Sequence, residues 1–517
     1  MMTPHTRSRT AVLVAFFVGM LPSVAAHAQE ATESDTNPRN HRYDRLVIDY
    51  LEISPKVEVR EVGDRPHAPE AEEATLTVYL RNLSDKRVYA AIEWGRTIGM
   101  EEVGYLSPGE TMSVPHTLPT AEIPYGSKIE AAYYDSAVHQ LVPTDSVLIH
   151  PADAMRVALV VEKKTWEAGN KRFGSFTRRM RDSFESLHDM FENGTAPAVL
   201  GLERVPVTDR FRIDHVEVYE QQETAEPDDP DETGQLPDLP PLFEDHPQYD
   251  LVINCNEGGR LGGFWMPHYT IGHTFYFVEE GEPVPGSTEP TQHIFDLWST
   301  WGEHALWHEM IHFRGVGDIY IYEIPAGALS AWTDEAVPVP EPWATEVLNY
   351  PYRDDIIVGP LAAAVMNSKA GIARVGSCED TTIEYGHMWK WVPAELKVAV
   401  TDAGGASALA GATVKWWASR SAGLEDARVQ GVAADRADSP DGQGSGEAAS
   451  ITGDYLNGGK DNWDDRSLWL LVEVTHPKSG ERRFGIVYGL WLNTAYAAGN
   501  TESVTWTISW DELKVAK

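Results

Sequence analysis

Hydrophobic and polar residues alternate along residues 46–150 with a period of two. Short runs such as 75–80, Thr-Leu-Thr-Val-Tyr-Leu, are separated by turn-forming segments at 82–85 and 107–110. A period of two is typical of strands with one buried face, and repeated turn signals are typical of a sandwich. We therefore predict an all-β sandwich over residues 46–150.

Residues 151–392 show a different pattern, in which strand-like and helix-like segments alternate. The runs 157–161, 211–219 and 251–254 predict strands, and residues 176–191 predict a helix. Apolar residues then recur at steps of three or four from Ile294 to His308, which predicts a helix that begins near Pro290. The pattern indicates an α+β domain with a mixed, twisted sheet backed by helices.

The period of two returns in residues 393–517, for example at 396–402 and 409–414, and predicts a second all-β sandwich. Because alternation puts most aromatic residues of a sandwich inside it, we expect Trp416, Trp417 and Trp469 in the core rather than on a sugar-binding surface. The expected fold class is therefore multidomain, with an α+β domain between two all-β sandwich domains.

The N-terminal residues indicate export. Arg7 and Arg9 precede the apolar run 11–20, and Ala26 and Ala28 fit the small-x-small pattern of a cleavage site. We predict a signal peptide over residues 1–28, a linker over 29–45, and secretion to the periplasm or the medium. No later apolar run is long enough to span a membrane.

Two features of the composition bear on partners and on cross-links. A formal net charge of −37 argues against nucleic acid and anionic membranes as partners, because the field of the protein would repel them. In an exported protein the two cysteines, Cys255 and Cys378, could form one disulfide bond.

Residues 308–318, His-Glu-Met-Ile-His-Phe-Arg-Gly-Val-Gly-Asp, carry the candidate chemistry. On a helix His308 and His312 share one face, so both imidazoles can bind one metal ion with Glu309 beside them as a general base. A catalytic zinc site takes three protein ligands, and Gly315 allows the chain to turn and bring Asp318 to the metal. We predict one catalytic Zn²⁺ bound by His308, His312 and Asp318.

Another ligand scheme takes a glutamate from a later helix, either Glu335 or Glu346. The proline-rich run 338–342 disfavours a helix there, and Gly315 would have no purpose in that scheme. His304 lies on the same helical face as His308, where it is better placed to support a ligand than to be one.

The motif resembles the His-Glu-x-x-His-x-x-Gly-x-x-His/Asp signature of metzincin zinc endopeptidases. Aspartate in the last place is similar to snapalysin-like and immune-inhibitor-A-like secreted bacterial peptidases. The resemblance covers residues 151–392 and implies a metalloendopeptidase, in which a zinc-activated water hydrolyses the peptide bond and Glu309 is the base. The alternative is a non-enzymatic exported adhesin or binding protein on a peptidase-like scaffold, which the intact motif disfavours.

The same resemblance implies further residues around the metal. Metzincins carry a methionine turn beneath it, for which Met366 is the candidate and Met388 the reserve. In this family an edge strand before the active-site helix pairs with the substrate, and the residues that resemble it are Gly262, Gly263, Phe264 and Trp265.

One position departs from the family pattern. Astacin-like and serralysin-like members place a tyrosine two residues after the turn methionine, where this chain has Ser368. Tyr320, Tyr350 or Tyr352 could take over the stabilisation of the oxyanion.

The flanking domains and two acidic segments are the remaining places where partners other than the expected protein or peptide substrate could bind. The flanking domains resemble immunoglobulin-like modules (46–150) and carboxypeptidase regulatory-like, transthyretin-type modules (393–517), which are candidates for binding a protein or a glycan. The acidic insert 220–246 lacks apolar periodicity and is predicted to be a surface loop. Residues 461–465, Asp-Asn-Trp-Asp-Asp, could bind Ca²⁺, although a solvated turn is the more frequent role of such a run.

Overall fold

The computed structural model describes residues 42–56, 71–95, 98–220, 248–256, 264–266, 270–274, 300–324, 336–349, 355–372, 388, 391–418, 442–445, 449–452 and 469–515. The predicted signal peptide, the start of the helix near Pro290 and most of the acidic insert lie outside these residues. So do the following predicted positions: Gly262, Gly263, Glu335, Tyr350, Tyr352, Cys378 and 461–465.

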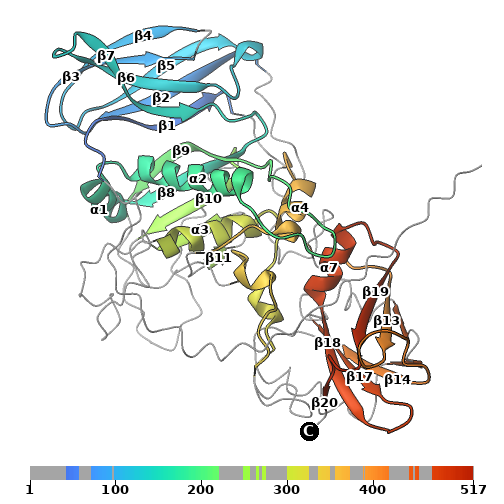
Figure 1. The fold of residues 1–517 in the computed structure, drawn as a ribbon. Helices are drawn as coiled ribbons and strands as arrows, with labels where there is room; N and C mark the ends of the chain where they lie inside the picture. The colour runs from blue at the N-terminus through green and yellow to red at the C-terminus, as the bar shows by residue number, and fades with distance from the viewer. Residues whose placement is uncertain are drawn as a thin grey trace, which may run out of the picture.

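The N-terminal region consists of two antiparallel sheets that share one core (Figure 1). One sheet has the order β1 (Leu46–Ser54), β2 (Glu73–Asn82), β5 (Thr111–Pro119). The other has the order β4 (Met100–Leu106), β3 (Val88–Glu93), β6 (Lys128–Asp135), β7 (Gln140–Leu148), and the short helix η2 (Thr120–Glu122) follows β5. Burial alternates along β2, as the period of two predicts, because every second side chain faces the other sheet.

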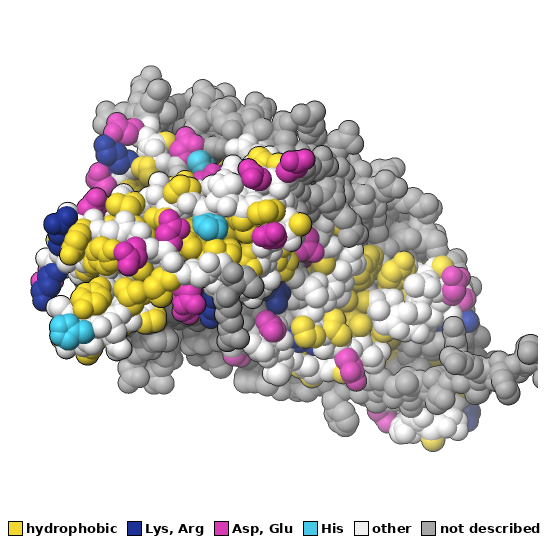
Figure 2. Space-filling model, turned by 90° about the horizontal axis from the view of Figure 1, so that it is seen from above, with side chains coloured by type: hydrophobic (Ala, Val, Ile, Leu, Met, Phe, Trp, Pro, Cys, Tyr) yellow, Lys and Arg dark blue, Asp and Glu magenta, His cyan; other side chains and the backbone are white. Residues whose placement is uncertain are grey.

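The exposed hydrophobic side chains of this region belong mainly to the second sheet. Met100, Tyr105 and Tyr134 are each more than two-fifths exposed. Figure 2, seen from above, shows hydrophobic side chains on this face with Asp and Glu side chains scattered among them. Whether this face binds a protein or a glycan stays a prediction.

The middle region contains a five-stranded mixed sheet with the order β11-β12-β10-β8-β9. Its strands are β8 (Met155–Glu162), β9 (Phe211–Tyr219), β10 (Leu251–Asn256), β11 (Phe264–Met266) and β12 (Thr270–Thr274). Neighbouring strands are parallel except at the edge, where β11 is antiparallel to β12. The predicted strands at 157–161, 211–219 and 251–254 are confirmed.

Two helices follow β8 directly. The first, α1 (Lys163–Phe173), was missed in the sequence because only Thr165, Gly169 and Phe173 on it are buried. The second, α2 (Phe176–Asn193), confirms the predicted helix and begins at the N-cap Ser175, whose Oγ accepts a hydrogen bond from the backbone N–H of Arg178.

The helix that carries the histidine motif is α3 (Thr300–His312), and it packs with α2 on one face of the sheet. Val157, Leu159 and Val161 of β8 share a core with side chains of both helices. A buried ion pair joins Arg179 of α2 to Glu303 of α3 at 2.5 Å, and Trp307 Nε1 donates to Ser183 Oγ at 3.1 Å. The helix α3 is thus fixed by polar contacts as well as by apolar packing.

The N-terminal region docks on α2 through buried polar contacts, several of which are made by the carboxylate of Asp145. Asp145 of β7 accepts hydrogen bonds from the guanidinium groups of Arg178 and Arg181 at 2.9 to 3.0 Å, and from the backbone N–H of Ile48 at 2.8 Å. All three side chains are buried or nearly so. The same helix α2 therefore contacts both the N-terminal region and α3.

Beyond α3 the chain forms the short helices η4 (Tyr320–Tyr322) and η5 (Trp343–Thr345), and then α4 (Pro360–Ser368). The C-terminal region has two sheets, with the orders β16-β13-β19 and β15-β14-β17-β18-β20. The strands are β13 (Glu395–Thr401), β14 (Thr413–Ala418), β15 (Gly442–Ser445), β16 (Ala449–Thr452), β17 (Trp469–Thr475), β18 (Arg482–Tyr488), β19 (Ser503–Ser509) and β20 (Lys514–Val515). Trp416 and Trp469 are buried, as predicted, and the side chain of Trp417 lies outside what the structure describes.

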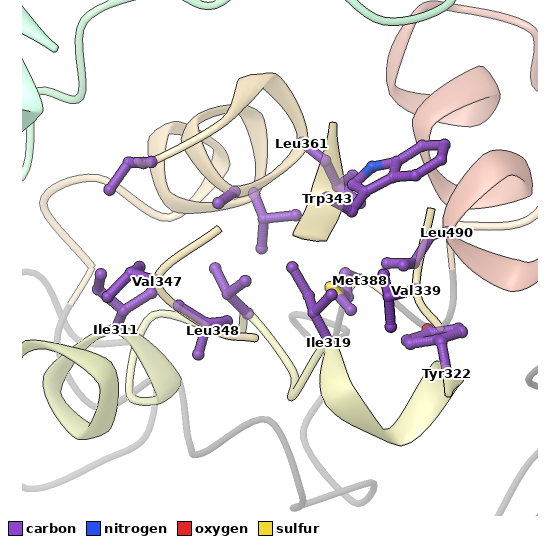
Figure 3. Close-up of a cluster of buried hydrophobic side chains, with 14 of the residues drawn as sticks. Ile311, Ile319, Tyr322, Val339, Trp343, Val347, Leu348, Leu361, Met388 and Leu490 are labelled. Carbon is purple, nitrogen blue, oxygen red and sulfur yellow. The ribbon is translucent and has the colours of Figure 1, made fainter. Parts of the chain in front are cut away.

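One hydrophobic core joins the middle region to the C-terminal region. It extends from the strands of the mixed sheet to Leu513, whereas the N-terminal sheets have a core of their own. The link is helix α7 (Gly489–Ala497), which contacts α4 and places Leu490 next to the residues that follow α3 (Figure 3). The predicted boundary between residues 392 and 393 is therefore crossed by a continuous core.

In the part of the chain that the structure describes, no helix is long and apolar enough to cross a membrane.

Candidate metal centre

Three buried side chains converge where α3 ends. His308 Nε2 lies 3.0 Å from Asp318 Oδ1, and His312 Nε2 lies 3.1 Å from the same oxygen. The two imidazole rings stand nearly perpendicular, with centroids 4.6 Å apart. Among the described residues this is the group of His, Cys, Asp and Glu side chains whose geometry could hold a metal ion. The structure thus brings together the three ligands predicted from the sequence.

In both histidines Nε2 faces Asp318, and the other ring nitrogen, Nδ1, is hydrogen-bonded to a backbone carbonyl oxygen. His308 Nδ1 lies 2.9 Å from the carbonyl oxygen of Val347, and His312 Nδ1 lies 2.8 Å from that of Val316. A carbonyl oxygen can only accept, so each Nδ1 carries the proton and donates it. Each Nε2 is therefore left with its lone pair for a metal ion.

The donor set fits zinc. Two imidazole nitrogens and one carboxylate oxygen are common zinc ligands, and three protein ligands leave a position open for water. Tetrahedral zinc with bonds of about 2.0–2.1 Å requires donor atoms about 3.3 Å apart. The two measured separations to Asp318 Oδ1, 3.0 and 3.1 Å, come close to that value.

The electrostatics of Asp318 favour its ionised form. Burial alone would raise the pKa of this carboxyl, but when the imidazoles are protonated, the charge of His312 and the hydrogen bonds from His308 and His312 outweigh burial and lower the pKa well below its usual range. A carboxylate that stays ionised is a stronger metal ligand than a neutral acid.

The turn between the second and third ligands requires glycine. Gly315 has a φ of 80°, in the left-handed region, and its N–H closes the helix end by donating to His312 O at 2.9 Å. A Cβ at this position would lie 2.7 Å from Lys369 Nζ, so the lysine side chain fills the space that a larger residue would need. The glycine is therefore needed for both backbone and packing reasons.

The residue before Gly315 anchors the turn to the segments that precede β9 and follow α4. The buried guanidinium of Arg314 donates to Asp209 Oδ2 at 2.7 Å and to the carbonyl oxygen of Ile372 at 3.0 Å. It also donates to the carbonyl oxygen of Lys369, the residue that covers Gly315. The turn is thus held on one side by the segment after α4.

Two other predicted residues lie beside the centre. Glu309 is buried on α3 next to His308, in the position expected of a base on this helix. Tyr320 donates to Asp318 Oδ2 at 2.9 Å, and its ring lies parallel to that of His308, with an interplanar angle of 8°. The hydroxyl of Tyr320 therefore contacts a ligand directly.

The methionine turn is not where the sequence placed it. Met366 is buried inside helix α4, which begins with Pro360 at its first position, so no turn exists at this residue. Met388, the reserve candidate, is also buried, and its backbone N–H donates to Gly315 O at 3.3 Å. Of the two, Met388 directly contacts the turn between the ligands.

The rival ligand Glu346 lies apart from the metal group. Its carboxylate is buried and accepts a hydrogen bond from the N–H of Gly359 at 2.9 Å. Burial raises its pKa to about 7. His304, also buried, packs against Trp307 with the two rings tilted by 39°, and it does not belong to the group of ligand atoms.

Two more predictions concern residues near the sheet. Phe264 and Trp265 belong to β11, which does lie at an edge of the mixed sheet. Cys255 is buried on β10, where burial raises the pKa of its thiol, and its predicted disulfide partner Cys378 lies outside the described residues.

Sequence reasoning missed the residues that hold the ligands in place. Val347 and Val316 act through their carbonyl oxygens, which no side-chain pattern can reveal. The burial of the charged residues Arg314 and Lys369 is likewise visible only in the structure.

Comparison with protein-family models and with curated proteins finds no match to this chain. The resemblance to metzincins therefore rests on the sequence motif.

Proposed function

We propose that the protein is a secreted zinc metalloendopeptidase of the metzincin type with Glu309 as its general base. The observation that carries this proposal is the convergence of His308 Nε2, His312 Nε2 and Asp318 Oδ1, with both Nδ1 atoms bound to carbonyl oxygens. A group of this kind binds zinc with one position left open, as a catalytic site requires.

Zinc at this position would lower the pKa of a bound water and polarise the carbonyl of a peptide bond. Glu309, on the helix that supplies both histidines, would accept the proton of the attacking water and pass it to the leaving amine. Tyr320 holds Asp318 through Oδ2, so that Oδ1 remains turned toward the two histidines. The residues of the chain thus supply the ligands, the base and their orientation.

An extended peptide suits the edge of the mixed sheet. Strand β11 is short and pairs on one side with β12, so its other side is the outer edge of the sheet among the strands that the structure describes. A peptide that adds to such an edge is bound through its backbone, and side-chain pockets then select its sequence. Protein or peptide is therefore the substrate that we propose.

The finer fold assignments belong to the same proposal. The mixed sheet with α2 and α3 on one face supports a metzincin-like catalytic domain. The two antiparallel sheets of the N-terminal region support an immunoglobulin-like module, and the C-terminal sheets support a transthyretin-type module.

The test is to measure zinc content and casein cleavage for the secreted chain, for Glu309→Gln, and for Glu122→Gln as a control on η2. We expect one zinc per chain in all three, and cleavage by the wild type and Glu122→Gln only. Stoichiometric zinc without cleavage by the wild type would overturn the peptidase proposal in favour of a binding protein. Absence of zinc would overturn the ligand set.

Export has its own test. The mature secreted protein should begin at Gln29, which N-terminal sequencing of the culture medium or periplasm would check.

A further inference from the structure

Helix α7 belongs to the C-terminal region by sequence, but its buried side contacts the residues around the metal centre. Leu490, Leu492, Asn493 and Thr494 are all buried, and α7 contacts α4. Figure 3 shows Leu490 close to Met388, Val339 and Tyr322, in the cluster that also contains Ile319. A polar residue, Asn493, is thus buried where the two regions meet.

The side-chain amide of Asn493 has partners for each of its polar atoms. Its Nδ2 donates to the carbonyl oxygen of Met388 at 2.9 Å and to that of Trp391 at 3.1 Å. Its Oδ1 accepts a hydrogen bond from Tyr322 OH at 3.3 Å. Because Asn493, Met388 and Tyr322 are all at most 2% exposed, water cannot replace these bonds.

These partners lie on the two sides of the third ligand. Met388 donates its N–H to Gly315 O at 3.3 Å, three residues before Asp318. Tyr322 ends η4, the same turn of helix from which Tyr320 donates to Asp318 Oδ2. Asn493 therefore connects the segment that enters Asp318 to the segment that leaves it.

We propose that Asn493 is a positioning residue for the metal centre, and that the C-terminal region is in this way a part of the centre. By fixing Met388 and Tyr322 relative to each other, the amide holds residues 313–322 in the conformation that brings Asp318 Oδ1 to the two histidines. The proposal rests on the metal site of the proposed function and does not depend on peptidase activity.

The test compares Zn²⁺ affinity in the full chain for the wild type, Asn493→Leu and Tyr322→Phe. Asn500→Leu is the matched control, because Asn500 also donates its amide to a carbonyl oxygen, that of Ala495, but is exposed at the end of α7. Zinc dissociation constants would be measured by chelator competition, and the melting temperatures of the zinc-free proteins would be measured in parallel.

We expect Asn493→Leu to raise the zinc dissociation constant about 10-fold or more, Tyr322→Phe to raise it by a smaller factor, and Asn500→Leu to leave it unchanged. An Asn493→Leu protein that folds and binds zinc like the wild type would overturn the proposal, since it would show a purely structural role. If Asn493→Leu does not fold, unchanged affinity in Tyr322→Phe would overturn it. A wild type that binds zinc but cleaves nothing contradicts the peptidase proposal alone and leaves this comparison valid.

Discussion

The phenol of Tyr320 donates to Asp318 Oδ2 at 2.9 Å, while Asp318 Oδ1 faces the two histidine Nε2 atoms. The two oxygens of one carboxylate thus have different roles, one toward the metal position and one toward the protein. A carboxylate held in this way is oriented before the metal binds, which reduces the entropic cost of metal binding.

Removing this hydroxyl should weaken zinc binding. In Tyr320→Phe the ring remains to stack on His308, but Asp318 Oδ2 loses its donor, and we expect the zinc dissociation constant to rise about 10-fold. Tyr219→Phe is the control, because Tyr219 OH donates to Asn254 Oδ1 at the same distance of 2.9 Å on the sheet, away from the ligands. Chelator competition measures both, and equal affinities would contradict the role assigned to Tyr320.

Gly315→Ala should destabilise the protein for two separate reasons. The backbone φ of 80° strains any residue with a Cβ, and this Cβ would also meet Lys369 Nζ at 2.7 Å. Gly201 has a φ of 79° with no atom near the Cβ position, so Gly201→Ala isolates the backbone strain of about 1–2 kcal/mol. Urea unfolding should show a larger loss for Gly315→Ala than for Gly201→Ala. An equal loss in both variants would show that Lys369 moves aside freely.

Glu346→Gln should change how stability depends on pH. Burial raises the pKa of Glu346 from 4.5 to about 7, so the folded state holds this proton more tightly than the unfolded state. The wild type therefore loses stability as the pH rises from about 4.5 to about 7, and the loss is then complete. Glutamine carries no charge, so the variant should be more stable than the wild type by about 2–3 kcal/mol at pH 8, with little difference at pH 4.5.

The measurement is the free energy of unfolding in urea at several pH values for both proteins, with Glu122→Gln as the exposed control. When the free energy of unfolding of the wild type is subtracted from that of the variant, the contributions of all other titrating groups, including the metal ligands, cancel. A difference that does not vary with pH would contradict the raised pKa.

Arg314→Leu should cost about 3–5 kcal/mol of stability, because it leaves the buried carboxylate of Asp209 without its cation. The Lys163–Glu220 pair has a comparable distance of 2.5 Å but is exposed to solvent. We therefore expect Lys163→Met to have a much smaller effect in the same unfolding measurement. Similar losses in the two variants would show that the Arg314–Asp209 pair contributes little.

Much of the fold could be predicted from periodicity. The strands β8, β9 and β10 and the helix α2 have apolar residues at regular intervals, because each buries a continuous face. Helix α1 buries only Thr165, Gly169 and Phe173, and because only Phe173 is strongly hydrophobic, its buried face gives a weak apolar pattern. The continuous core through α7 could not be foreseen either, since apolar residues on a helix do not reveal which sheet or helix they pack against.

The metal ligands could be predicted because their spacing is local. His308, Glu309 and His312 are placed by a single helix, and Gly315 fixes the turn that brings Asp318 back. Residues such as Val347 and Asn493 come from distant segments and act through contacts that only the tertiary structure creates. The prediction of a turn at Met366 is wrong because Pro360 starts a helix that continues through this residue.

The buried carboxylate of Asp145 should keep the N-terminal region bound to α2 even after the chain is cut by a protease. A cut between β7 and β8 would separate the N-terminal sheets from α2 in the covalent chain, but Arg178 and Arg181 would still need their counter-charge. Dissociation would expose two guanidinium groups and one carboxylate that are now shielded, along with the apolar side chains around them. A nicked molecule should therefore remain a noncovalent pair of fragments and elute as one species under native conditions.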